Sequence, residues 1–329
     1  MANSIELSIV IVTYKSKEYI SRCIQSIREA TQGLSFEISI VDNASGDGLA
    51  DLVHAEFPEV ILVENEKNEG FARGINRGVK LSSGRYLAIL NPDTQLNPEA
   101  LKILLNFLEN HPLNCIVGPR TVDEKGGLIA SCRSLPHIGN IIKYPLSLLL
   151  QGKKLKNPKR YLLDIWEQNR TIDVTKYNGY ITGACIITQL DFFKKMSMLD
   201  ERYFLYCEDI DFGFRMRQEG YPAFFVSEAS VIHHSGRSAS QNVQSPSYFV
   251  DAYIRYIHKN FTFLHGIAYE ICFFLFVLGW MMEVFLRRER GQTSILLKTL
   301  RCFIHPYCST NKANSYGIKE KDANHCSSS

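Results

Sequence analysis

The sequence has 329 residues, with 45% hydrophobic and 22% charged residues and a formal net charge of +3 at pH 7. This composition is typical of a globular protein with one large or two small domains, and the small charge argues against a dedicated nucleic-acid binder. The nine cysteines have neither paired nor Cys-x-x-Cys spacing, which predicts reduced, buried thiols in a cytosolic protein rather than a disulfide framework or a zinc site.

The N-terminus shows no basic stretch followed by an apolar one, so we expect no signal peptide and a protein that stays in the cytoplasm. Strand and helix patterns then alternate. Apolar, β-branched runs predict strands at residues 7–12, 36–41, 60–63 and 86–90, and helical spacing predicts helices at 19–30, 48–57, 70–81 and 98–110. This alternation predicts an α/β fold whose mostly parallel sheet has helices on both faces and binds its ligand at the carboxyl ends of the strands.

The second half of the chain has weaker patterns. We predict strands at 115–118, 180–188 and 223–232 and a helix at 208–220, whereas 119–180 lacks periodicity and is expected to contain a mobile loop. Five basic residues lie between Lys153 and Arg160. They form either a solvated basic loop or a contact for anionic lipid or a diphosphate.

A C-terminal apolar segment spans residues 261–286, but its uninterrupted apolar core, 271–282, is only twelve residues long. A membrane-spanning helix needs roughly 20. Arginines follow at 287, 288 and 290, so we predict an amphipathic helix at a membrane interface or a re-entrant one. A spanning helix and a buried core or dimer helix remain alternatives. The polar sequence after residue 309 predicts a disordered tail.

The run Asn91-Pro92-Asp93 ends the fourth predicted strand. Proline cannot donate to a sheet ladder, so the strand stops and Asp93 stands just past its tip. A carboxylate there is a ligand for a hard divalent cation, which neutralises negative charge that develops during a reaction. The same three residue types are also common in turns, so the alternative is a turn that binds no metal.

The stretch from Asn68 to Asn76 holds Gly70, Gly74 and Arg73. Small residues let the backbone approach a ligand closely, and an arginine there is placed to meet a phosphate. The stretch is not a P-loop, because no Gly-Lys-Ser/Thr follows, and it does not follow the first strand as a dinucleotide fingerprint would. A glycine-rich helix start is the alternative.

Glu208-Asp209-Ile210-Asp211 places three carboxylates at a predicted helix N-terminus. Helix capping explains one of them, and Asp211 is spaced to pair with Arg215. A surplus carboxylate at the mouth of a cleft suits a general base. Farther on, His233-His234 ends the last predicted strand, where a neutral imidazole either joins a metal shell or satisfies a local hydrogen bond.

In this order the motifs resemble the family 2 glycosyltransferases of the GT-A fold, most closely the bacterial branch that contains rhamnosyltransferases. The matching segments are Ser8–Tyr14, Val41–Ser45, Asn68–Asn76, Leu90–Thr94, Gly183–Ala184 and Tyr203–Arg215, and the resemblance covers roughly residues 5–240. It implies an inverting transfer from a nucleotide diphosphate sugar, with Mg²⁺ or Mn²⁺ as cofactor.

The resemblance also implies roles by position. The donor nucleotide is expected to contact Thr13, Tyr14, Asp42, Asn43, Gly70, Arg73, Asn76 and Asn91. Within this set, Asp42 is similar to the carboxylate that reads the pyrimidine edge, and the three residues from Gly70 to Asn76 match the loop near the ribose and diphosphate. Asn91 and Asp93 match the family's metal-binding Asp-x-Asp, with Asn91 in place of the first aspartate.

Asp93 and His233 are therefore the expected metal ligands, and His234 is the fallback for His233. Asp209 matches the catalytic base and Glu208 its neighbour. The implied domains are a nucleotide-sugar-binding half over 1–100, an acceptor-binding half over 101–260, membrane-associating helices over 261–308 and a disordered tail over 309–329.

The resemblance favours dTDP-L-rhamnose as donor, with UDP-hexoses or UDP-galactofuranose as alternatives. The expected acceptor is a polyprenyl-diphosphate-linked saccharide, used by a peripheral enzyme on the inner face of the cell membrane for cell-wall or O-antigen polysaccharide. No nucleic-acid partner is expected, and a homo-oligomer stays open. Two other classes also stay open: a nucleotidyltransferase, which normally has a glycine-rich turn where Thr13–Ser16 stands, and a non-catalytic nucleotide-sugar-binding subunit, which would be expected to lose Asp93 or Asp209.

Overall fold

The computed structural model describes residues 5–111, 114–136, 170–234 and 245–286. The first half contains β1 (Leu7–Thr13), α1 (Lys17–Ala30), β2 (Phe36–Asp42), α2 (Leu49–Glu56), β3 (Ile61–Glu64), α3 (Phe71–Leu81), β4 (Tyr86–Leu90), β5 (Thr94–Leu96) and α4 (Ala100–Asn110). Next come β6 (Ile116–Val122), β7 (Leu128–Ile129), β8 (Cys132–Ser134), β9 (Ile172–Asp173), the 3-10 helix η1 (Val174–Tyr177), β10 (Gly179–Ile181) and β11 (Cys185–Gln189). The last elements are α7 (Leu190–Lys195), α8 (Glu208–Gln218), β12 (Ala223–His233), α10 (Ser245–Asn260) and α11 (Phe263–Leu286).

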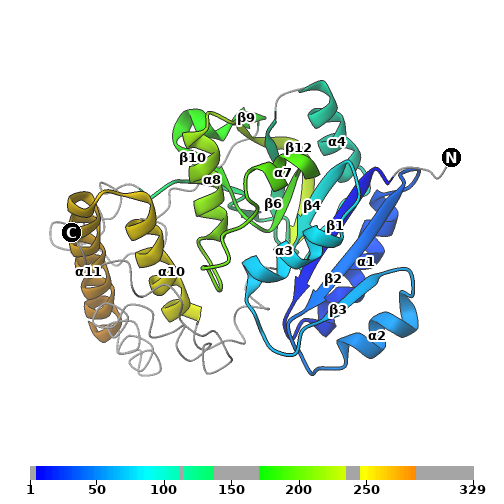
Figure 1. Ribbon diagram of the computed structural model, residues 1–329, viewed down its shortest axis with the longest axis horizontal. Helices are drawn as coiled ribbons and strands as arrows, with labels where there is room; N and C mark the ends of the chain where they lie inside the picture. Colours follow the sequence, from blue (N-terminus) through cyan, green and yellow to red (C-terminus); the bar gives the residue numbers. More distant parts are fainter. Residues whose placement is uncertain (1–4, 112–113, 137–169, 235–244, 287–329) are drawn as a thin grey trace.

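One sheet runs through the molecule in the order β3-β2-β1-β4-β11-β6-β12-β5 (Figure 1). β1 pairs in parallel with β2 and β4, and β2 pairs in parallel with β3, so the predicted mostly parallel sheet is confirmed. β11 runs antiparallel to both of its neighbours, β4 and β6. This reversal places Cys185, the first residue of β11, opposite Leu90, the last residue of β4. The residues just before β11 therefore reach the carboxyl-end edge of the parallel strands, which is the edge where sheets of this kind bind their ligands.

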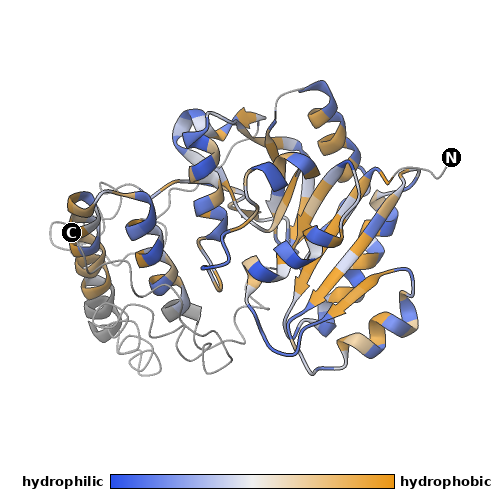
Figure 2. Cartoon of the chain, in the orientation of Figure 1, coloured by the Kyte–Doolittle hydropathy of each residue, from blue (hydrophilic) through white to orange (hydrophobic). Residues whose placement is uncertain are grey.

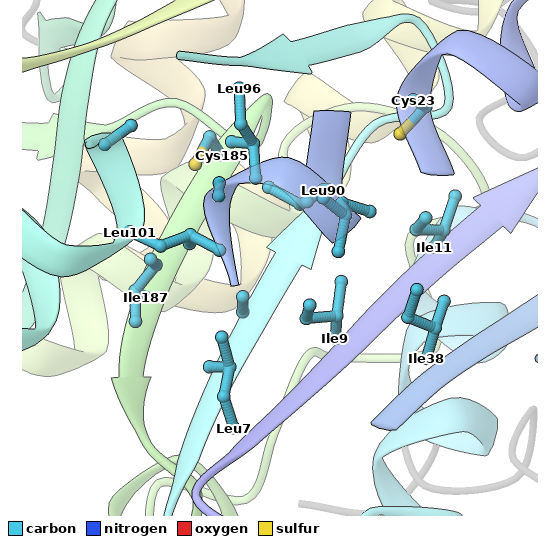
Figure 3. Packing of buried hydrophobic residues seen from close by; sticks show 14 of the residues in the cluster. Leu7, Ile9, Ile11, Cys23, Ile38, Leu90, Leu96, Leu101, Cys185 and Ile187 are labelled. Atoms are coloured by element: carbon cyan, nitrogen blue, oxygen red, sulfur yellow. The ribbon is translucent and has the colours of Figure 1, made fainter. Parts of the chain in front are cut away.

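Helices cover both faces of the sheet. Successive residues of β1 point to opposite faces, so each face contributes its own set of side chains to the core. Leu7, Ile9 and Ile11 pack with side chains of α1, α2 and α4 (Figure 3). Val10 and Val12 pack on the other face with side chains of α3, α7 and α8. Burial on both faces explains why these strands read as unbroken apolar runs, and Figure 2 shows that apolar character along the central strands.

Several short elements had no sequence prediction. β5 contributes only Thr94–Leu96, which pair with the end of β12. The described parts of 119–180 contain the end of β6, then β7, β8, β9, η1 and the start of β10. Elements of two to four residues are too short to show a period. The basic stretch from Lys153 to Arg160, and the predicted tail after residue 309, lie outside the described residues.

The two C-terminal helices, α10 and α11, pack against β10 and the start of α8 through a third hydrophobic cluster. Tyr253 and Tyr256 of α10 and Phe273 of α11 join Tyr180 and Tyr203 in this cluster. The other side of α11 stays exposed, and Phe263 and Leu264 at its start are 81% and 77% exposed. The predicted apolar C-terminal segment is thus a helix that is buried along one side. In the described part of the chain, no helix has both the length and the apolar content that crossing a bilayer requires.

The cysteines of the described part agree with the expected reduced thiols. Six of them are free, and five of these six are buried. Burial raises the pKa of the Cys23 and Cys115 thiols to about 12, so the protonated form, which is a poor nucleophile and a poor metal ligand, prevails.

Candidate active site

The first strand tips form one side of the site. Parallel pairing sets Thr13 of β1 beside Asp42 of β2. The Thr13 hydroxyl donates a hydrogen bond of 2.9 Å to Asp42 Oδ1, and the backbone N–H of Ser45 donates one of 3.1 Å to Asp42 Oδ2. The Asp42 carboxylate is buried and held in one orientation by residues of the same edge. Tyr14, next along the chain, is partly exposed beside Lys15, whose backbone is left-handed with φ 54°.

Asn43 ties the tip of β2 to the glycine-bearing loop. Its amide nitrogen donates to the Gly70 carbonyl at 3.1 Å, and its amide oxygen accepts from Asn65 at 2.8 Å. The side chain is 2% exposed. Asn43 therefore fixes the position of the loop that leads into α3.

The glycine-bearing loop contacts the segment that precedes α8. Gly70 has φ +88°, and a Cβ there would lie 2.4 Å from the Phe204 carbonyl oxygen. The N–H of Phe71 donates to that same carbonyl at 2.7 Å. Glycine is thus required at position 70 by a positive φ combined with ψ 171° and by the close approach of another backbone.

Two further residues of α3 are engaged with the same segment. The Asn76 amide donates to the Leu199 carbonyl at 2.8 Å and accepts from the Leu199 N–H at 3.1 Å. Arg73 Nε lies 3.3 Å from Glu201 Oε2. The structure brings Gly70, Arg73 and Asn76 together on this segment, and their contact with a donor stays a prediction.

Asp93, Asn91 and His233 meet at the ends of β4 and β12. His233 Nε2 lies 3.1 Å from Asp93 Oδ1 and 3.3 Å from Asn91 Nδ2. Asp93 is 3% exposed. His234 contributes its backbone N–H to the Asp93 carbonyl, whereas its ring contacts Glu124. The geometry favours His233 over His234 as the partner of the Asp93 carboxylate.

Asp209 lies in the first turn of α8. Its Oδ2 accepts from the Gly183 N–H at 3.1 Å and its Oδ1 from the Ile210 N–H at 2.8 Å. The helix begins after Tyr206 and Cys207, which both have left-handed backbones with φ of 72° and 65°. Non-glycine residues rarely adopt this conformation, and it occurs where surrounding structure enforces it, often at functional sites.

Glu208 is buried and Asp209 is half-buried, and the two carboxyl groups have different surroundings. Burial, and then the neighbouring Asp209 carboxylate, raises the pKa of Glu208 to about 8, and Glu208 Oε2 has no hydrogen-bond partner. Burial raises the pKa of Asp209 too, but the N–H groups of Gly183 and Ile210 oppose that rise. Two N–H donors favour an ionised carboxylate, so the proton of the pair resides on Glu208 and the negative charge on Asp209.

The connection between β10 and β11 joins the two halves of the site. The Asn91 N–H donates to the Ala184 carbonyl at 3.1 Å, while the N–H of Gly183, one residue earlier, binds Asp209. The Asn91–Asp93–His233 group and Asp209 therefore flank the same two residues. Gly183 and Ala184 belong to the matching segments named above, but no pattern in the sequence indicated that they bridge the two groups.

A cluster of charged side chains around the buried Asp211 carboxylate holds α8 in place. The predicted pair of Asp211 and Arg215 is confirmed at 2.9 Å. The Asp211 carboxylate is also contacted by Lys259 of α10, at 2.7 Å, and by the Tyr203 hydroxyl, at 3.3 Å. Lys259 lies in a helix that had no sequence prediction, so its part in this cluster was not foreseen.

Comparison with known proteins identifies the family. Residues 8–176, just over half of the chain, match Glycosyl transferase family 2. The N-acetylglucosaminyl-diphospho-decaprenol L-rhamnosyltransferase of Mycobacterium tuberculosis is 26% identical over 250 residues, which cover 73% of this chain and 79% of that protein. The low-salt glycan biosynthesis hexosyltransferase Agl10 of Haloferax volcanii is 25% identical over 286 residues, which cover 84% and 83% of the two chains.

The fold has a counterpart among solved structures. A crystal structure of residues 1–349 of S. aureus TarS superposes with a TM-score of 0.51 at 15% identity and covers 94% of this chain and 83% of that one. This likeness concerns the fold. The match to the family decides among the classes that the sequence left open, and the predicted similarity to rhamnosyltransferases is confirmed. The chain belongs to glycosyl transferase family 2 and is a glycosyltransferase.

Proposed function

We propose that this glycosyltransferase transfers a sugar, with inversion, from a nucleotide diphosphate sugar to a hydroxyl of a polyprenyl-diphosphate-linked saccharide. The observation that carries the proposal is the position of Asp209 on one side of Gly183–Ala184 and of Asn91, Asp93 and His233 on the other. A single displacement needs a base at the attacking oxygen and stabilisation of the departing group on the opposite side.

Asp209 is the base in this proposal. Its carboxylate takes the proton of the acceptor hydroxyl as that oxygen bonds to the anomeric carbon, and the bond from the anomeric carbon to the donor phosphate breaks. Protonated Glu208 beside it leaves the negative charge of the pair on Asp209. Asp42, which Thr13 and Ser45 hold by hydrogen bonds, is the proposed contact of the nucleoside, and Asn43 positions the loop at Gly70 beside it.

Asp93 and His233 are the residues that would hold Mg²⁺ or Mn²⁺. Two ligands at right angles around an ion with bonds of about 2.1 Å lie about 3 Å apart, and the two atoms here are 3.1 Å apart. No group of three or more His, Cys, Asp or Glu side chains suited to a metal occurs in the described residues. Mg²⁺ commonly takes only one or two carboxylates together with substrate phosphates, so the pair fits a metal that binds with the donor diphosphate. A bound metal supplies charge neutralisation for the departing diphosphate.

The donor proposed first is dTDP-L-rhamnose, because the Mycobacterium tuberculosis relative is named an L-rhamnosyltransferase. That name also supports a lipid-diphosphate-linked N-acetylglucosamine as the acceptor class. The second relative is named a hexosyltransferase, which keeps UDP-hexoses, and with them UDP-galactofuranose, as alternative donors.

We further propose that the protein works at the inner face of the cell membrane as a peripheral protein. The support is the exposed side of α11, where apolar side chains recur at helical spacing. They are Phe263, Leu264, Ile267, Ile271, Phe274, Leu275 and Leu278. Such a stripe suits insertion into the headgroup region, where a lipid-linked acceptor is held. A homo-oligomer that covers the same stripe is the alternative.

The test is a transfer assay with purified full-length protein. It uses dTDP-rhamnose, UDP-glucose, UDP-galactose and UDP-galactofuranose, with Mg²⁺ or Mn²⁺ and a short-chain lipid-diphosphate N-acetylglucosamine acceptor, and product is detected by mass spectrometry. We expect transfer from one donor, and a loss of at least a thousandfold in Asp209→Asn. Asp51→Asn, which changes an exposed carboxylate on α2, is the matched control and should retain activity. Absence of product with every donor would overturn the proposal.

A further inference from the structure

Arg133 is a cationic residue on the base side of the site that the proposed reaction does not use. It lies in β8, which pairs antiparallel with β10 so that Arg133 stands directly opposite Tyr180. Residues directly opposite each other in such a pair project from the same face. That face is turned toward α8, because a Cβ on Gly213 of α8 would lie 2.5 Å from the Tyr180 Cβ. Arg133 thus projects toward the helix that begins with Glu208 and Asp209.

The Arg133 guanidinium has a hydrogen-bond donor that no group of the described residues accepts from. Arg133 Nε is buried and has no hydrogen-bond partner. Its charge acts on both Asp209 and Tyr180. Two other cations beside α8, Arg215 and Lys259, both bind Asp211. A buried donor without an acceptor is costly to keep, and it is a group that a ligand can satisfy.

The end of β8 leads to the C-terminal helices. Leu135 lies in the cluster with α10 and α11, and the Tyr269 hydroxyl of α11 donates to the Pro136 carbonyl at 3.4 Å. The segment that carries Arg133 therefore connects the surroundings of the base with the helix that carries the exposed apolar stripe. Consider a lipid-linked acceptor that approaches Asp209 from the side of α11. The group that joins its sugar to its lipid would then lie near the Arg133 guanidinium.

We propose that Arg133 binds a phosphate or diphosphate group carried by the acceptor. This inference rests on the proposed function and adds the group that recognises the acceptor. In an inverting displacement the leaving diphosphate departs on the side away from the base, which is the side of Asn91, Asp93 and His233. A cation on the base side is suited to an anion that arrives with the nucleophile. The planar guanidinium offers two parallel donors to phosphate oxygens.

The experiment compares two acceptors that carry the same sugar, one as a short alkyl diphosphate and one as a neutral alkyl glycoside. Wild type, Arg133→Met and Arg133→Lys are assayed with each acceptor and the same donor. We expect Arg133→Met to raise KM for the diphosphate acceptor at least tenfold, with a smaller change in kcat, and to leave KM for the neutral acceptor unchanged. Arg133→Lys should recover part of the loss. Arg217→Met, which removes an exposed cation from the end of α8, is the matched control.

Binding without turnover gives a second readout. Calorimetry of the alkyl diphosphate acceptor in the absence of donor should show weaker binding to Arg133→Met, and inorganic diphosphate should compete with that acceptor only at much higher concentration. Equal losses with both acceptors would overturn the inference, because Arg133 would then act only on Asp209. Competition by inorganic diphosphate at the same concentration as the acceptor would also overturn it, because the site would then bind a free anion. Transfer to neither acceptor by wild type would instead overturn the proposed function.

Discussion

Lys259 Nζ, near the end of α10, lies 2.7 Å from Asp211 Oδ1 and 2.6 Å from Asp200 Oδ2. Asp211 is completely buried and lies two residues after Asp209 in α8, where Arg215 binds its other oxygen. The C-terminal helices are therefore attached by charge to the helix that carries the proposed base. The same cluster reaches the loop before α8, because Asp200 lies next to Leu199 and Glu201, which contact α3.

Removal of this cation should weaken both the fold and the reaction. Lys259→Met leaves Asp200 and Asp211 with fewer partners in a buried setting, and we expect a loss of about 1–3 kcal/mol in the free energy of unfolding. Turnover should fall more than donor binding, because the first turn of α8 loses support. Urea unfolding and initial rates measure the two effects. Lys102→Met, at a side chain that is 78% exposed on α4, should change neither. Wild-type stability in Lys259→Met would contradict the expected support.

The two histidines at the end of β12 should respond differently to substitution. His233 Nε2 faces Asp93, whereas His234 contacts Glu124. We expect His233→Gln to lower the affinity for a nucleoside diphosphate with Mn²⁺ by at least about tenfold, in line with the loss of a group at a metal site. Without metal, wild type and His233→Gln should bind the nucleoside diphosphate with the same affinity. His234→Gln is the comparison and should retain the metal effect. Calorimetric titrations with and without Mn²⁺ measure this, and an equal effect of both variants would exclude the assignment of His233.

The stability of the protein should depend on pH through Glu208. Burial raises the pKa of Glu208 from its usual value to about 8 in the folded protein. A raised pKa means that the folded state prefers the protonated form of Glu208. The contribution of Glu208 to the free energy of unfolding is therefore fully present at pH below the unfolded pKa, near 4.3, and is lost as the pH rises through about 8.

Glu208→Gln keeps a neutral side chain of similar shape at every pH. Between pH 6 and pH 9 its melting temperature should therefore fall less than that of wild type, and thermal unfolding at the two values measures the difference. Glu219→Gln, at the exposed end of the same helix, should behave like wild type. An equal fall in Glu208→Gln and wild type would show that Glu208 is not held neutral.

Gly70 should tolerate alanine poorly, and the structure provides a matched control. Gly70 and Gly33 both have a positive φ, of +88° and +84°, but of the two only Gly70 has a neighbour, the Phe204 carbonyl, in the space that a Cβ would occupy. Gly33→Ala should cost about 1 kcal/mol for the left-handed backbone. Gly70→Ala should cost about 2 kcal/mol more, because the Phe204 backbone must move. It should also weaken donor binding. Urea unfolding and nucleotide titration test this, and equal costs at the two glycines would argue against the contact.

The sequence by itself determined the sheet and the strand-tip residues. Apolar runs such as Leu7–Val12 are long enough to show that both faces are buried, and polar residues follow them directly. Because parallel strands end at one edge, Thr13, Asp42 and Asp93 were expected near each other without knowledge of side-chain contacts. The sequence also predicted that the carboxylates of Glu208, Asp209 and Asp211 lie at the start of a helix, since a helix N-terminus has a local signature.

The tertiary structure decided which of these residues meet. β11 enters the sheet antiparallel and sets Gly183 and Ala184 between Asn91 and Asp209, an arrangement fixed by pairings between residues about ninety positions apart. Arg133 and Lys259 gained their positions in the same way, from a three-residue strand and from a helix whose partners lie elsewhere in the chain. Such contacts depend on long-range packing and charge, which leave no period in the local sequence.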